Sequence, residues 1–344
     1  MGRHGAVKAL GRCKALRGVL ALLGVAWSVH VSAASAKLRG ATPRGTIWIQ
    51  NYHEGEDNRD PNWAGTIPHN NLGKSLVRST ILSGLHLRSF SCYGITCDPR
   101  RNLICFARGR SDPEDYNGQS VFYLARTNGT STHLLKRQGI NYARNKVVDI
   151  EPRFMPNGDI LFNSHDRIAI MNREGKNLRF LTGTNERCGN ATVSRDVRKV
   201  AFESNGLWVM SATGRHRRKL LSYLTYYGWG MPNNYEPLTN SGVAISPNGK
   251  LIAYSRDSNI YVLSTSAPAS KAHPAHRISG RDRRFRLEEY INPVWSPNGK
   301  YLAVAGGKEY AHDVYLIEVA TGKTRRLTAR PQDEIPNAWV TSKS

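Results

Sequence analysis

The chain lacks several sequence features that would mark a spanning membrane protein, a haem enzyme or a hydrolase. Its longest mostly apolar run, Val19 to Val31, has about 13 residues, whereas a spanning helix needs roughly 20. No Gly-x-Ser-x-Gly sequence occurs, which excludes a nucleophile elbow. No Cys-x-x-Cys-His occurs either, so attached haem is unsupported. No stretch outside the N-terminus has the pattern of a long amphipathic helix, and we therefore expect an all-β fold.

Acidic residues are absent from the first 36 positions. Five basic residues precede the apolar run, and Ala34-Ser35-Ala36 follows it as a small-x-small cleavage site. This pattern predicts a cleaved signal peptide over residues 1–36 and a periplasmic or secreted protein. Val31-Ser32-Ala33 is a second acceptable cleavage site, and an uncleaved anchor is the alternative.

The chain has many more basic than acidic residues, 49 against 26, with a formal charge of +23. Cleavage after residue 36 would remove five basic residues and leave +18. A field of this sign favours polyanions such as lipid headgroups or acidic polysaccharide. Export makes nucleic acid an unexpected partner. The alternative is that the charge only keeps the protein soluble.

The cysteines are few. Cys13 lies in the predicted signal peptide, which leaves Cys92, Cys97, Cys105 and Cys188. An even number in an oxidising compartment permits two disulfides, and three of these residues fall in one hairpin. We therefore expect a bridge within or beside that hairpin, with buried thiols as the alternative. The spacings do not resemble a zinc site, and we expect no metal there.

A repeated unit dominates the rest of the chain. Its clearest copy combines residues 293–304, which contain a Ser-Pro-Asn-Gly-Lys turn, with a strand at residues 314–317 and a polar strand at residues 323–328. Related turns begin at Pro99, Pro156, Arg195, Pro247 and Pro297, each followed by an apolar strand. Asn-Gly is favoured where both turn residues need positive φ. Such a period indicates stacked blades of a β-propeller.

The third strand of each unit is a short run rich in β-branched and aromatic residues, as expected for strands buried between blades. These runs are residues 121–124, 168–171, 207–210, 260–263 and 314–317. Residues 335–340 look like the first strand of another blade, and residues 46–50 look like a third strand. A blade shared between the two termini would remove exposed sheet edges. We expect six blades over residues 37–344, clearest over about 90–330, or seven if residues 51–90 hide another.

The repeat formed by residues 293–304, 314–317 and 325–328 resembles that of the TolB-like propeller family, over roughly residues 90–340. Residues 149–162 are also similar to repeats in hydrazine-synthase alpha-subunit-like propellers. TolB has an α/β domain before its propeller and is a periplasmic partner in an envelope-spanning complex. Only about 50 residues separate the predicted cleavage site from the first clear blade, so this chain resembles the propeller part alone.

Charged residues gather in the loops that, in a propeller, surround one mouth of the central channel. These are the loops between second and third strands and those that lead into first strands. The candidate ligand-binding residues are Arg110, Asp112, His165, Asp166, Arg167, Glu203, Arg256, Asp257, His312 and Asp313. The alternative is that these loops are polar because they are wet. An acidic loop around His53 is a weaker candidate for a cation.

The sequence favours an exported, non-catalytic propeller that binds an envelope protein or an anionic glycan or lipid, with peripheral membrane contact. Basic runs at residues 215–219, 281–286 and 325–326 would form a rim for such contact. The second hypothesis is a lyase or hydrolase that acts on an acidic saccharide or small molecule through His165, His312 and nearby carboxylates. The sequence identifies no cofactor.

Overall fold

The computed structural model describes residues 44–50, 64–67, 80–81, 92–109, 120–141, 147–222, 242–267, 275–308, 311–329 and 333–341. The chain divides into two units, Met1–Ala41 and Thr42–Ser344, and all described residues belong to the second. The predicted signal peptide lies outside the described residues. Those residues contain no helix long and apolar enough to cross a membrane.

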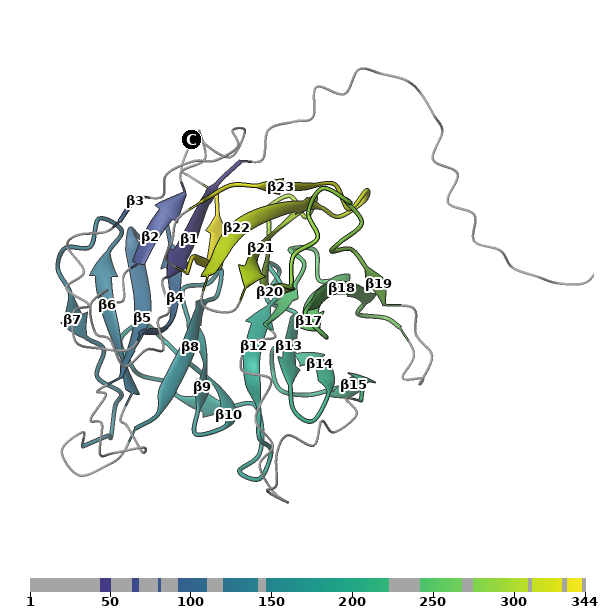
Figure 1. Cartoon of the computed structure of the whole chain (residues 1–344). Helices are drawn as coiled ribbons and strands as arrows, with labels where there is room; N and C mark the ends of the chain where they lie inside the picture. Colours follow the sequence, from purple (N-terminus) through teal and green to yellow (C-terminus); the bar gives the residue numbers. More distant parts are fainter. Residues whose placement is uncertain are drawn as a thin grey trace, which may run out of the picture. The chain divides into compact units, whose positions relative to one another are not determined.

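Six four-stranded antiparallel sheets make up the described part of the chain (Figure 1). We number them as blades 1 to 6 and name the strands of each from first to fourth, starting at the propeller axis. Blade 1 contains β4 (Cys92–Asp98), β5 (Leu103–Gly109), β6 (Ser120–Arg126) and β7 (His133–Leu134). Blade 2 contains β8 (Asp149–Phe154), β9 (Ile160–Ser164), β10 (Arg167–Met171) and β11 (Arg179–Phe180). Blade 3 contains β12 (Gly189–Val193), β13 (Lys199–Glu203), β14 (Leu207–Ser211) and β15 (Arg218–Leu221).

The remaining three blades follow the same order. Blade 4 contains β16 (Val243–Ile245), β17 (Leu251–Arg256), β18 (Asn259–Ser264) and β19 (His276–Arg277). Blade 5 contains β20 (Glu289–Trp295), β21 (Tyr301–Lys308), β22 (Ala311–Glu318) and β23 (Thr324–Arg326). Blade 6 contains β24 (Ile335–Val340), β1 (Thr46–Gln50), β2 (Ala64–Ile67) and β3 (Thr80–Ile81). The predicted second, third and outer strands of the five repeats are confirmed, although the outer strands are shorter than expected.

The blades form a closed ring of six. First strands of neighbouring blades contact one another around the whole circuit, from β4 through β24 and back to β4. Each pair of neighbouring blades also shares an apolar cluster. The alternation of strand residues explains this, because odd and even positions pack on opposite neighbours. Ile47 and Ile49 pack against blade 5, and Trp48 between them packs against blade 1. A seventh blade is thereby excluded from the described ring.

Blade 6 joins the two ends of the second unit, and one assignment needs correction. The sequence suggested a third strand at residues 46–50, but β1 pairs directly with β24 and is the second strand. In Figure 1 the purple β1 stands beside the yellow C-terminal strands. Strand composition alone does not distinguish a second strand from a third, since both are buried and rich in β-branched residues.

The Pro-Asn-Gly turns also differ from expectation. Only their glycines have positive φ, for example Gly249 at 66°, and the asparagines do not. Gly249 N–H donates to Ser246 O at 2.8 Å, and Asn248 Oδ1 accepts from Lys250 N–H at 3.0 Å. The motif is therefore a turn that begins at the residue before proline, Met155, Ser246 or Ser296, and ends on a left-handed glycine.

The cysteine side chains that the structure describes do not form the expected bridge, and the side chain of Cys92 lies outside the described part. Cys97, Cys105 and Cys188 are buried thiols rather than half-cystines. Cys97 faces the cluster shared with blade 6, and Cys105 faces the cluster shared with blade 2. Side chains on opposite faces of one sheet cannot reach each other. Burial raises the pKa of the Cys97 thiol, so this group is unreactive.

Candidate functional site at the loop end

Two ends of the propeller axis can be distinguished from the strand order. The turn end carries the connections between first and second strands. The loop end carries the connections between second and third strands and the starts of the first strands. Every described candidate residue lies at or near the loop end. Arg110 and Asp112 lie outside the described residues.

His165 and Asp166 form the tight turn between β9 and β10. Both have positive φ, 47° and 60°, as a two-residue hairpin turn requires. His165 Nε2 lies 3.4 Å from the backbone nitrogen of Val148, and Asp166 O accepts from Cys188 N–H at 2.8 Å. Both side chains are exposed. The pair therefore shapes the turn and leaves both side chains exposed to solvent.

Asp257 occupies the same place in blade 4. It forms a tight turn with Ser258, both at positive φ, and its carboxylate lies 3.3 Å from Arg256 Nε. Asp257 is exposed, like Asp166. Two blades thus present an aspartate from a hairpin turn at the loop end.

Arg167 points away from the axis, toward the outer strand of its own blade. Its guanidinium lies 3.6 Å from the centroid of the Phe180 ring and donates to Thr182 O at 3.3 Å. Phe180 is the one exposed large apolar side chain among the described residues. The cation–π contact covers that ring and holds Arg167 away from the loop end of the axis.

Glu203 belongs to a buried network between blades 2 and 3. Asn190 Nδ2 donates to Glu203 Oε2 at 3.0 Å, and Asn190 N–H donates to Glu151 Oε2 at 2.8 Å. Glu151 and Asn190 both have positive φ, at places where the pairing with the second strand shifts register. Burial raises the pKa of Glu151, against the opposing effects of Arg153 and the Asn190 N–H. Burial also lowers the pKa of Arg153.

His312 lies between two carboxylates at the junction of blades 5 and 6. Its Nε2 is 2.7 Å from Glu289 Oε1, and its Nδ1 is 3.1 Å from Asp333 Oδ1. The His312 N–H also donates to Asp333 Oδ1 at 2.7 Å. Burial alone would lower the pKa of His312, but Asp333 and Glu289 outweigh it and raise the pKa above its ordinary value. The next residue, Asp313, accepts from Arg326 Nη2 at 2.5 Å.

The structure does not bring the two candidate histidines together. His165 belongs to blade 2 and His312 to blade 5, which are three places apart in a ring of six. His312 is buried and has both ring nitrogens engaged, whereas His165 is exposed. No group of three or more His, Cys, Asp or Glu side chains in the described ranges is arranged to hold a metal ion.

The candidate set omitted several ionisable groups that the structure gathers at the loop end. Asp149 is held by Arg137 Nη1 at 2.8 and 2.9 Å, and both side chains are buried. Glu334 is fully buried beside Asp333. The sequence could have indicated these acids, because each stands immediately before a first strand or at its start. Nothing in the sequence pairs Arg137 with Asp149.

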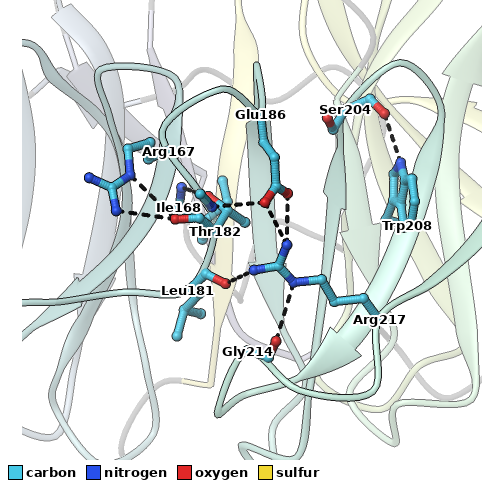
Figure 2. A network of polar contacts seen from close by, with 10 residues as sticks. Arg167, Ile168, Leu181, Thr182, Glu186, Ser204, Trp208, Gly214 and Arg217 are labelled. Atoms are coloured by element: carbon cyan, nitrogen blue, oxygen red, sulfur yellow. Dashed lines mark hydrogen bonds and ion pairs between the residues drawn. The ribbon is translucent and has the colours of Figure 1, made fainter.

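A second polar network joins blades 2 and 3 farther from the axis (Figure 2). Arg217 Nη1 donates to both oxygens of Glu186, at 2.7 and 2.8 Å, and its other nitrogens bond Gly214 O and Leu181 O. Glu186 Oε1 accepts from Gly183 N–H at 2.8 Å. Burial would raise the pKa of Glu186, but the Gly183 N–H and Arg217 lower it below its usual range. The network ties the connection between the two blades to the outer edge of blade 3.

These groups can recognise charge, but the described histidines are poorly placed for catalysis. A general base needs a free nitrogen within reach of the substrate proton. His312 would have to give up a carboxylate contact to supply one. The acid near His165 is Asp149, and its carboxylate is already held by Arg137. The loop end instead offers exposed turn aspartates around buried carboxylates.

Comparison with known proteins finds likeness at the level of structure alone. No family pattern matches the sequence, and no curated protein matches it. TolB from Acinetobacter baumannii is similar with a TM-score of 0.57 and 15% identity, over 86% of this chain and 66% of that chain. A chain of the Nidogen/Laminin complex has a TM-score of 0.57 and 13% identity, over 87% of this chain and 100% of that chain. The chain thus spans about two thirds of the Acinetobacter TolB. The closed ring and these likenesses agree that the fold is a TolB-like six-bladed β-propeller.

Proposed function

We propose that this protein is a non-catalytic binding module of the cell envelope, and that its loop end receives a segment of a partner protein. Support for export comes from the N-terminal sequence pattern. Support for protein binding comes from the fold, since one similar chain was solved within a complex of nidogen with laminin. The main argument for the proposal comes from the residues at the loop end, because a fold does not itself dictate function.

One observation carries the proposal: the charge at the loop end is opposite in sign to that of the chain. The chain as a whole is strongly basic, yet carboxylates collect where the first strands begin. They are Asp149, Glu151, Glu203, Glu289, Asp333 and Glu334. Arg137, Arg153 and His312 are set among them. The same end also carries the cations Arg187, Arg256 and Lys308 and the exposed acids Asp166, Asp257 and Glu288. An excess of carboxylates favours a partner segment that carries lysine or arginine.

The enzymatic alternative has weaker support. A lyase or hydrolase at this end would need an acid and a base at one place. The two candidate histidines lie in different blades, and His312 is enclosed by carboxylates. We therefore assign recognition rather than chemistry to the loop end.

Capture from envelope extracts tests the proposal. The bait is the full chain, compared with Asp166→Asn/Asp257→Asn and with the control Glu174→Gln/Asp196→Asn. Both variants remove two exposed carboxylates, but the control sites lie in turns at the other ends of strands. We expect a specific protein to be recovered with the wild type and the control, and several-fold less with the loop-end variant. Recovery of no specific protein, or equal loss in both variants, would contradict the proposal.

A further inference from the structure

The connections at the turn end touch one another around a large part of the ring. Arg101 Nη2 donates to Asn157 O in the next blade at 3.1 Å. Arg195 N–H donates to Pro247 O at 3.2 Å, linking blades 3 and 4. A side chain at Gly299 would meet Pro247 Cδ at 3.8 Å, so blades 4 and 5 also meet here. We call these five turns together the turn ring; it comprises residues 99–102, 155–159, 194–198, 246–250 and 296–300.

The turn ring is basic. Its cations are Arg100, Arg101, Arg195, Arg198, Lys250 and Lys300, and its only acids are Asp159 and Asp196. All of these cations except the half-buried Arg101 are exposed. The repeat explains why cations gather here. The residue after the turn glycine stands at the turn end, just before the second strand begins. That residue is lysine in both Pro-Asn-Gly-Lys copies.

Most of these charges have no acidic partner within the described ranges. Lys250 and Lys300 form their hydrogen bonds through the backbone: their N–H groups donate to Asn248 Oδ1 and Asn298 Oδ1, and their carbonyl oxygens accept from Thr265 N–H and Val319 N–H. Arg198 is 84% exposed and its Nε is 3.7 Å from Asp196 Oδ2. The charges therefore stand in solvent, where an external anion can meet them.

The basic runs expected from sequence to form a rim are largely engaged within the fold. Arg217 binds Glu186, and Arg218 donates to Thr265 O and Ala267 O. Arg284 binds Asp282 at 2.7 Å, and Arg326 binds Asp313 at 2.5 Å. Paired cations contribute little to an external field. Arg215, Arg283 and Arg286 of those runs remain exposed, whereas the turn ring places five exposed cations at one end of the axis.

We propose that the turn ring docks this protein on a bilayer rich in anionic lipid headgroups, with the carboxylate-rich loop end directed away. The two ends of one axis carry opposite charge, so an anionic surface attracts one end and repels the other. This orientation leaves the loop end open to a partner. The proposal does not depend on the proposed function, because the two involve opposite ends.

The character of the turn ring favours a lipid surface over an acidic polysaccharide. Its charges are carried by side chains spread around the axis, which suits many headgroups lying in one plane. The ring contains no aromatic residue that could stack on a sugar. It also exposes no large apolar side chain that could insert into the bilayer. Docking should therefore be peripheral and sensitive to salt.

Sedimentation with vesicles tests the proposal. Full-length protein is mixed at low salt with vesicles of phosphatidylglycerol and phosphatidylcholine, or of phosphatidylcholine alone. The ring variant is Arg195→Glu/Lys250→Glu/Lys300→Glu. The control is Arg283→Glu/Arg286→Glu/Lys308→Glu, which changes net charge equally at exposed positions outside the turns of the turn end. Residues 1–36 are present in all three proteins, so the comparison isolates the ring.

The wild type and the control should bind the anionic vesicles, and salt should release both. Each basic residue near such a surface contributes about a fivefold gain in partitioning, so the ring variant should bind at least roughly 100-fold more weakly. Equal loss in both variants would overturn the proposal, because net charge alone would then explain binding. So would binding to an acidic polysaccharide such as alginate with none to the vesicles, or wild-type binding to pure phosphatidylcholine that matches the anionic vesicles.

Discussion

At the scale of single residues, the loop end contains two kinds of charged group: buried groups that are paired, and exposed groups on turns. His312 illustrates this, since burial and its two carboxylates act in opposite directions on its pKa and the carboxylates prevail. Asp166 and Asp257 show the other pattern, exposed on tight turns that keep them in place. Buried charges here stabilise the junctions between blades, and exposed ones are available for binding.

The pH dependence of stability should report on His312. Its pKa is raised in the folded state, so protonated His312 contributes stability that is fully present below the unfolded pKa. That contribution is lost as pH rises through the folded pKa. We expect the free energy of unfolding to fall from mildly acidic to alkaline pH, and His312→Gln to flatten this slope.

Urea unfolding at a series of pH values makes this measurement. His133→Gln serves as the control, because His133 is exposed on an outer strand. An unchanged slope in His312→Gln would contradict the assignment of the pH dependence to His312.

At the scale of strands and turns, neighbouring blades are joined by close contacts between backbones. Gly175, in the turn between β10 and β11, has φ 74° and packs against the segment that leaves β7. A Cβ at Gly175 would lie 2.0 Å from Lys136 O. Arg217 and Glu186 join the next pair of blades through side chains.

Substitution of two glycines separates the cost of a left-handed alanine from the cost of a clash at this contact. Gly139 has φ 78° and nothing within 4 Å of an added Cβ. Gly139→Ala should therefore cost about 1–2 kcal/mol, the ordinary cost of a left-handed alanine. Gly175→Ala should cost at least about 2 kcal/mol more, because its Cβ would collide with backbone. Equal losses in thermal or chemical unfolding would contradict the close contact between blades 1 and 2.

The ion pair between blades 2 and 3 should give a measurable coupling energy. A double-mutant cycle of Arg217→Ala and Glu186→Gln should yield about 0.5–1 kcal/mol at neutral pH, since both side chains are partly exposed. The pKa of Glu186 is lowered on folding, so the coupling should vanish as pH falls through that folded pKa. A coupling that persists in strong acid would show that packing, not charge, joins the pair.

Sequence reasoning predicted the elements well and their chemistry less well. Apolar runs after the repeated turns located the second strands of blades 1 to 5, and short runs rich in β-branched and aromatic residues located the third strands. Burial between blades demands such runs. The turn asparagines were wrongly expected to have positive φ, since Asn-Gly also fits a turn in which the glycine alone is left-handed. The pairs between His312 and Asp333 and between Arg137 and Asp149 join segments that only the ring brings together. No local pattern could have indicated them.

At the scale of the whole ring, closure depends on pairing between the two ends of the second unit. Trp339 on β24 is 7% exposed, packs with Ile47 and Ile49, and donates its indole N–H to Arg44 O at 3.0 Å. Closure removes the sheet edges that would otherwise invite association. It also fixes the opposite charges at the two ends of one axis.

Truncation of Trp339 should loosen closure. Trp339→Ala should cost about 3–5 kcal/mol and raise amide hydrogen exchange in β1. Trp208→Ala is the control, because Trp208 lies on β14 and bonds Ser204 O within blade 3. Its exchange should rise around β14 instead. Unchanged exchange in β1 of Trp339→Ala would contradict the role of Trp339 in closure.

Photo-crosslinking in the envelope tests the binding function most directly. A crosslinking amino acid is placed at Asp166 or Asp257 at the loop end, or at Arg198 or Lys300 on the turn ring. The account predicts one protein partner crosslinked from both loop-end positions and not from the turn-ring positions. No protein crosslinked from the loop end, or the same protein crosslinked equally from both ends, would contradict it.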